Sequence, residues 1–89
     1  MKGVITMKYI AVRVAKNAKG EYVVQGQKST DYNWETLDML VTENFLPTAN
    51  NLAVAVAKSL SRAYGNYIPA YGVGGYGIGA FYKGYPHNK

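Results

Sequence analysis

The first part of the chain alternates apolar and polar residues over 4–16, as a half-buried strand does. The alternation predicts one side with Ile10, Val12 and Val14 and an opposite side with Tyr9, Ala11 and Arg13. The segment NAKG at 17–20 follows, where Asn17 suits the start of a type I turn and Gly20 the left-handed position of a bulged loop. The segment EYVVQGQ at 21–27 then returns, so we expect an N-terminal β-hairpin.

The hydrophobic period changes to that of a helix after residue 29. One side of this segment holds the apolar residues Trp34, Leu37, Val41 and Phe45. Thr30 or Asp31 can accept the first free backbone N–H groups, and Pro47 disfavours helical geometry in the residue before it. We therefore expect a first helix that ends near Leu46, with its tryptophan mostly buried.

A second helix is predicted from a cap at Thr48 to about Tyr64, where Gly65 and Asn66 offer a left-handed exit. The segment LAVAVA at 52–57 also alternates large and small residues, which is a strand pattern. Helix is the better interpretation because alanine favours it. An apolar line also continues through the helix at Leu52, Val56, Leu60 and Ala63.

The segment YIPAYGVGGYGIGAFY at 67–82 interleaves glycine with tyrosine. A two-residue turn at Gly74 and Gly75 predicts a closing hairpin. In this register one face is bare and lets a helix lie close, since it carries Gly72, Gly77 and Gly79. The opposite face carries Tyr67, Tyr71, Tyr76 and Tyr82. The spacing G-x-G-x-x-G at 72–77 does not indicate a dinucleotide site, because no acidic residue follows it.

The order of these elements predicts an α+β fold of the form ββααββ. Two hairpins form one four-stranded antiparallel sheet, and the two helices between them cover one face. The 89 residues are 48% apolar and 17% charged, which suits a single small domain over 1–89 with frayed ends at 1–3 and 86–89. Cysteine is absent and charges at Lys8 and Arg13 interrupt the first apolar run, so we expect a cytoplasmic protein with no membrane contact.

The charged residues favour an anionic partner and offer no catalytic group. The net charge is +5, and the five acidic residues all lie between 21 and 43, which predicts an acidic side and basic ends. His87 is the only histidine and stands near the end of the chain. Ser59 and Ser61 lack a nucleophile elbow. We therefore expect no enzymatic activity, no metal and no cofactor.

Two interpretations of the predicted tyrosine face remain open. The tyrosines either pack on neighbouring strands or form an exposed patch that binds a partner. In the second case the candidate partner-binding residues are Tyr67, Tyr71, Tyr76 and Tyr82 together with Lys58, Arg62 and Lys83. These residues could bind a protein surface. They could also bind a single-stranded nucleic acid, with its bases stacked on the tyrosine rings and its phosphates bound by the cations.

In its layout the chain resembles small phage-encoded inhibitors of host defence, including the anti-CRISPR type. The segments that carry the resemblance are MKYIAVRVAKNAKGEYVV as a hairpin, ANNLAVAVAKSLSRAY as a helix and YIPAYGVGGYGIGAFY as closing strands. The resemblance implies a protein that binds and blocks a host protein or nucleoprotein complex. The alternative is a small basic nucleic-acid-binding protein, which ranks second because the motifs of known RNA-binding modules are missing.

Overall fold

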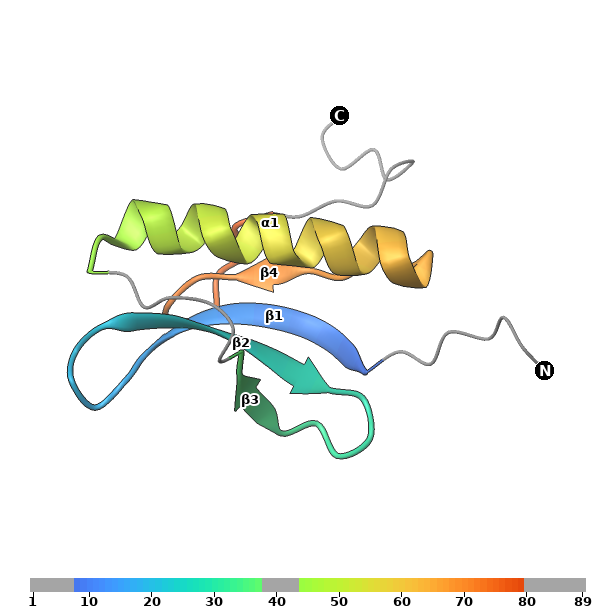
Figure 1. Cartoon of the computed structure of the whole chain (residues 1–89), viewed down its shortest axis with the longest axis horizontal. Coiled ribbons are helices and arrows are strands. Elements are labelled where there is room, and N and C mark those ends of the chain that lie inside the picture. Colours follow the sequence, from blue (N-terminus) through green and yellow to red (C-terminus); the bar gives the residue numbers. More distant parts are fainter. Residues whose placement is uncertain (1–7, 38–43, 80–89) are drawn as a thin grey trace.

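The computed structural model describes residues 8–37 and 44–79. In chain order it contains β1 (Tyr9–Lys16), β2 (Tyr22–Lys28), β3 (Trp34–Thr36), α1 (Leu46–Tyr64) and β4 (Ala70–Tyr71). The strands form one sheet in the order β3-β2-β1-β4. The helix α1 runs along this sheet and packs on β1, β2 and β4 (Figure 1).

The N-terminal hairpin is confirmed. Strands β1 and β2 pair antiparallel up to Lys16 opposite Tyr22. The Asn17 side chain closes the turn, because its Oδ1 atom accepts the N–H groups of Lys19 and Glu21, each at 2.9 Å. Gly20 has a φ of 82°, the left-handed conformation that the turn requires.

A β-bulge at Ile10 changes which residues of β1 share a face. The pairing shifts by one residue between Tyr9 and Ala11, so Ile10 is the extra residue. Tyr9 therefore lies in the core beside Val12, and not on the side of Arg13 as simple alternation predicts.

The first predicted helix is wrong. Residues 34–36 form β3, which pairs antiparallel with β2 and places Glu35 opposite Gly26. Asp31 does not cap a helix; its Oδ1 accepts the Asn33 N–H at 3.1 Å in the turn before β3. Pairing with β2 outweighs the helical spacing of Trp34, because an aromatic residue fits a sheet well. Val41, which belonged to the same prediction, lies outside the described residues.

The second predicted helix is confirmed as α1, with an earlier start. Phe45 occupies the N-cap and Pro47 lies in the first turn, where a missing N–H costs nothing, so Thr48 is inside the helix. Gly65 ends the helix with a φ of 70° and donates its N–H to the Ser61 carbonyl at 2.9 Å. The expected exit at Gly65 is thus correct.

The face of α1 that packs on the sheet is a stripe of small residues. It consists of Ala49, Ala53, Ala57 and Ser61, all buried. The expected apolar line falls on the flank of this stripe, with Leu52, Val56 and Leu60 only partly buried and Ala63 exposed. Small side chains let the helix lie close to Val12, Val14 and Val24 of the sheet, which explains the difference.

The predicted closing hairpin and the all-antiparallel sheet are also wrong. Strand β4 has two residues and pairs parallel with β1, Val12 with Ala70 and Arg13 with Tyr71, so the sheet is mixed. A turn does occur after β4, where the Gly72 N–H donates to the Tyr76 carbonyl at 2.8 Å. A single bridge, Tyr71 to Gly77, follows it among the described residues, one residue out of the expected register.

Glycines of this turn do not lie under the helix. A Cβ on Gly77 would meet no described atom within 4 Å. A Cβ on Gly72 would lie 2.7 Å from the tip of the Tyr76 ring. Of the predicted bare face, Gly72 therefore packs against a tyrosine of its own turn, and Gly77 meets no described neighbour.

Candidate binding groove

Arg13 and its cross-strand neighbours lie on one face of the sheet, the face opposite α1. Cross-strand partners share a face, and the register places Arg13 opposite Gln25, Gln25 opposite Thr36, and Gln27 opposite Trp34. The parallel pair adds Tyr71 beside Arg13. Four strands therefore contribute one row of polar, aromatic and cationic side chains.

Arg13 is held at the centre of this row. Its guanidinium carbon lies 4.2 Å from the centre of the Trp34 ring, a cation–π contact. Its Nε donates to Gln25 Oε1 at 2.8 Å, and Gln25 Nε2 donates to Thr36 Oγ1 at 3.1 Å. No hydrogen bond to the residues described here uses the two terminal nitrogens of Arg13. They are therefore fixed in place and able to bind an anion.

A groove of about 560 Å³ opens beside Arg13. Its lining is Arg13, Val14, Ala15, Lys16, Trp34 and Tyr71, completed by the turn 72–75. The lining holds two cations and two aromatic rings and no acidic residue. It also holds no cysteine, serine or histidine that could act as nucleophile or base. Its chemistry is that of binding.

The fold creates the groove because β4 is short. The strand ends at Tyr71, and the chain then leaves β1 to form the turn. Gly74 and Gly75 have φ values of 94° and 88°, which only glycine adopts without strain. The turn therefore stands beside β1 without covering Val14 to Lys16, and the space between them is the groove.

The predicted tyrosines are divided between this groove and its surroundings. Tyr71 lines the groove and is partly buried. Tyr76 is 53% exposed and its ring packs on Gly72, next to the groove. Tyr67 is partly buried and lines a second hollow of about 430 Å³, which also includes Tyr71 and Ile78.

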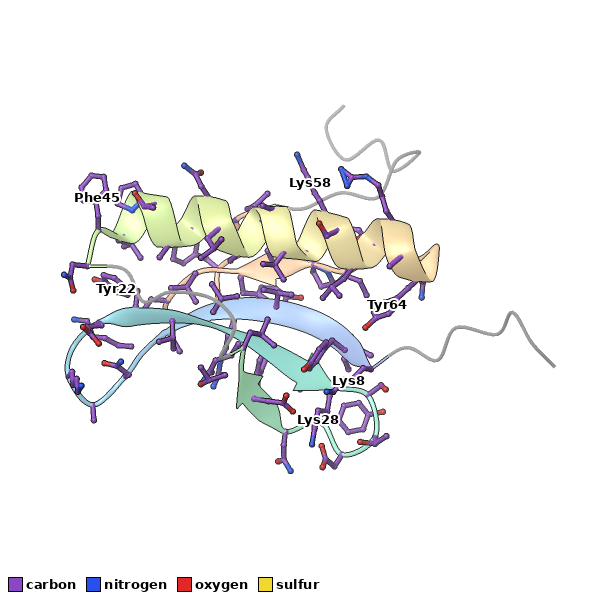
Figure 2. All side chains as sticks on the ribbon, in the orientation of Figure 1. Lys8, Tyr22, Lys28, Phe45, Lys58 and Tyr64 are labelled. Carbon is purple, nitrogen blue, oxygen red and sulfur yellow. The ribbon has the colours of Figure 1, made fainter. Side chains whose placement is uncertain are left out.

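Two of the predicted cations lie on α1 and do not line the groove with Tyr71. Lys58 and Arg62 are exposed on α1, one turn apart. Figure 2 shows Lys58 pointing away from the strands. These two side chains lie on the opposite side of the molecule from Arg13 because the sheet lies between them. Tyr82 and Lys83 lie outside the described residues.

Sequence reasoning missed the residues that define the groove, Arg13, Lys16 and Trp34. Arg13 was recognisable as the one charged residue on its side of the first strand. Trp34 was assigned to the buried side of a helix, whereas in β3 it is only partly buried and stacks on Arg13. Nothing in the local sequence indicates that these two side chains meet, because they come from strands separated by β2.

A second charged cluster lies at the other end of the sheet and joins three strands. The Tyr9 hydroxyl donates to Glu35 Oε2 at 2.9 Å, and Lys28 Nζ lies 3.5 Å from Glu35 Oε1. Lys8 Nζ lies 3.8 Å from Glu35 Oε2. The Tyr9 hydrogen bond, followed by the two lysine charges, lowers the pKa of Glu35 below its ordinary value. Desolvation by burial raises the pKa of Tyr9. The mutual pairing of these groups makes the cluster a structural one.

Searches with this chain against protein-family models, curated proteins and solved structures found no significant match. Within the described ranges, no helix is long and apolar enough to cross a membrane. The same ranges hold no group of histidine, cysteine and carboxylate side chains placed to bind a metal ion.

Proposed function

We propose that the protein is a non-enzymatic interaction protein that binds another protein through the groove beside Arg13. The observation that carries this proposal is the combination of a preorganised arginine, two aromatic walls and no acidic residue in one concave surface. Arginine, tryptophan and tyrosine are the residues most often found at the energetic centre of protein interfaces. The pair Arg13 and Trp34 is fixed before binding, so ordering these side chains costs little on association.

Single-stranded nucleic acid is the second candidate, and the geometry favours it less. Base stacking needs an open aromatic face, but the Arg13 guanidinium covers one face of Trp34. A nucleic-acid site also needs several cations along the path of the backbone. Lys58 and Arg62, the cations expected to serve this role, are exposed on α1 and do not line the groove.

The narrower identity, a phage-encoded inhibitor that blocks a host protein or nucleoprotein complex, stays a prediction. The resemblance behind it was one of layout, and the layout with two helices and two hairpins is not the one observed. A small interaction domain with one concave cationic surface is compatible with such a role. The partner, whatever its source, should present an acidic surface to the groove.

Affinity purification from the cells that produce the protein tests the proposal. We expect a protein partner that stays bound after nuclease treatment. Arg13→Gln and Tyr71→Ala should each reduce recovery, corresponding to a loss of about 1 kcal/mol or more of binding free energy. The matched control is the double variant Lys58→Glu, Arg62→Glu, which changes two exposed cations away from the groove and should leave recovery unchanged. Loss of the partner with nuclease, or in the control variant alone, would contradict the proposal.

A further inference from the structure

The edge of β1 that lines the groove has no described pairing partner beyond Arg13. The Val12 N–H donates to the Pro69 carbonyl at 3.0 Å on the side of β4, and the Asn17 N–H donates to the Glu21 carbonyl at 2.8 Å on the side of β2. Backbone N–H and C=O groups alternate in direction along a strand, so those of Val14 and Lys16 point to the same side as those of Val12, the side of β4. In residues 8–37 and 44–79, the pairing of β1 on that side ends at Arg13 opposite Tyr71.

No described strand pairs with Val14, Ala15 and Lys16 on the side of β4, so the described part of the chain leaves a strand position unfilled there. The position continues the line of β4, because β4 pairs with Val12 and Arg13 immediately before it. At about 3.3 Å per residue, the open edge is roughly 10 Å long and accepts about three residues of extended chain. The groove of about 560 Å³ lies over the same residues, so the space beside the edge is not filled by side chains.

The charges around the open edge select an acidic occupant. Arg13 points to the face of the sheet opposite α1, and its terminal nitrogens make no hydrogen bond to a described residue. Lys16 lies three residues after Arg13, so its side chain points to the opposite face of the sheet, the one that α1 covers. There its Nζ lies 5.5 Å from the centre of the Tyr22 ring. Side chains of an added strand also alternate between the two faces. An acidic side chain therefore finds a cation on either face.

We infer that the partner contributes an extended acidic segment, which adds to the sheet as a strand along Val14 to Lys16, in the line left by β4. The inference rests on the proposed function and specifies its mode of recognition. Backbone hydrogen bonds to the edge of β1 supply affinity, as in other cases of strand addition. Arg13 and Lys16 supply the preference for acidic residues, and Trp34 and Tyr71 bound the groove.

Selection from a library of displayed random peptides of about eight residues, a length that covers a typical strand, provides the probe. We expect enriched peptides to alternate acidic residues with β-branched or aromatic ones. The strongest binder is then synthesised, and its binding is followed by the fluorescence of Trp34, the only tryptophan. Amide NMR signals of 14–16 and 72–75 should shift on binding.

Methylation of backbone nitrogens in this peptide separates strand addition from side-chain binding. N-methyl groups at the amides that face β1 should weaken binding at least about tenfold, and those at the alternate amides should change it less than about twofold. Lys16→Pro, which removes the outward N–H of the edge, should have a similar effect, whereas Lys16→Gln keeps the N–H and should cost less. Arg13→Gln should make binding less dependent on salt. The N-methylated peptides are tested with the unchanged protein, so they distinguish strand addition from side-chain binding even if Lys16→Pro fails to fold.

Three results of the peptide selection and the N-methylation series would overturn the inference. These are the absence of any enriched peptide, enrichment of basic peptides, and equal tolerance of N-methylation at all amides. Competition for the groove by a short oligothymidylate with higher affinity than the peptide would also overturn it, in favour of nucleic acid. If affinity purification yields a nuclease-resistant partner while the peptides fail, the proposed function stands and only strand addition is rejected.

Discussion

At the scale of single residues, Ser61 connects the end of α1 to the strand that follows. It is buried, and its Oγ donates to the Ala57 carbonyl at 2.8 Å while accepting the Ile68 N–H at 2.9 Å. Its own carbonyl accepts the N–H groups of Gly65 and Asn66. Ser61 thus satisfies a buried backbone donor at the point where the chain turns from the helix toward β4.

We predict that Ser61→Ala lowers the free energy of unfolding by about 1 to 3 kcal/mol, because it leaves the buried Ile68 N–H without its acceptor. Urea denaturation followed by circular dichroism measures this. Ser59→Ala is the matched control, since Ser59 is exposed on the same helix and its replacement should change little. Equal stability of both variants would mean that the bond to Ile68 is replaced by water.

Alanine substitutions at two glycines, Gly26 and Gly77, should have opposite effects on stability. A Cβ on Gly26 would lie 2.6 Å from the buried Tyr9 ring, whereas a Cβ on Gly77 would meet no described atom within 4 Å. We therefore expect Gly26→Ala to lower the free energy of unfolding by about 1 to 3 kcal/mol through overpacking. Gly77→Ala should leave stability nearly unchanged, contrary to the expectation that Gly77 lies under a helix. Thermal unfolding of the two variants side by side distinguishes them.

At the scale of elements, α1 depends on small side chains for its position on the sheet. Ala53 is fully buried in the middle of the stripe, and Ala55 on the same helix is exposed. Ala53→Leu should destabilise the protein by about 1 to 3 kcal/mol or more, because the added atoms must push α1 away from Val12 and Val14. Ala55→Leu adds the same atoms on the outer side and should be nearly neutral. Chemical denaturation of both variants measures the difference, and similar stability would show that α1 can shift without cost.

The pairing of β3 with β2 also explains why Trp34 was wrongly predicted to lie in a helix. Trp34 and Leu37 are three residues apart, a spacing that fits a helix. The pairing of Trp34 with Gln27 and of Glu35 with Gly26 places the segment in the sheet instead. A strand of three residues gives too short a pattern to be distinguished from one turn of helix by spacing alone. Only the presence of β2 beside it decides between the two.

At the scale of the whole molecule, the cluster around Glu35 makes stability depend on pH. The pKa of Glu35 is lowered in the folded state, first by the Tyr9 hydroxyl and then by Lys8 and Lys28, so folding favours its charged form. The stabilisation is fully present above the ordinary pKa of 4.5 and is lost as the pH falls through the lower, folded-state pKa.

We therefore predict that Glu35→Gln reduces the loss of stability in acid. Urea denaturation at a series of pH values below and above about 4.5 measures the slope, which should be shallower in the variant than in the wild type. Tyr9→Phe removes the first cause of the pKa shift while keeping the ring, and should weaken the pH dependence in the same direction. An unchanged slope in Glu35→Gln would show that the charged cluster does not contribute to stability.

In the whole molecule, the cations of α1 and the cation Arg13 of β1 lie on different sides of the sheet, a separation that the sequence does not indicate. Lys58 and Arg62 are exposed on α1, and Lys58 points away from the strands (Figure 2), whereas Arg13 lies on the face of the sheet opposite α1. Among the described residues, Arg13 shares a concave surface with the rings of Trp34 and Tyr71. Of the predicted site residues, Tyr71 therefore lines the groove, whereas Lys58 and Arg62 lie on α1.

The sequence by itself determined the parts of this protein that depend on residues close together in the chain. The turn at Asn17 and Gly20 and the end of α1 at Gly65 follow from local backbone chemistry, so they were predictable. The strand at Trp34, the parallel pairing of β4 with β1 and the stack of Arg13 on Trp34 join residues far apart in the chain. Their energies depend on partners that only the folded chain brings together, so the tertiary structure alone decided how β3 and β4 join the sheet and, with them, the groove.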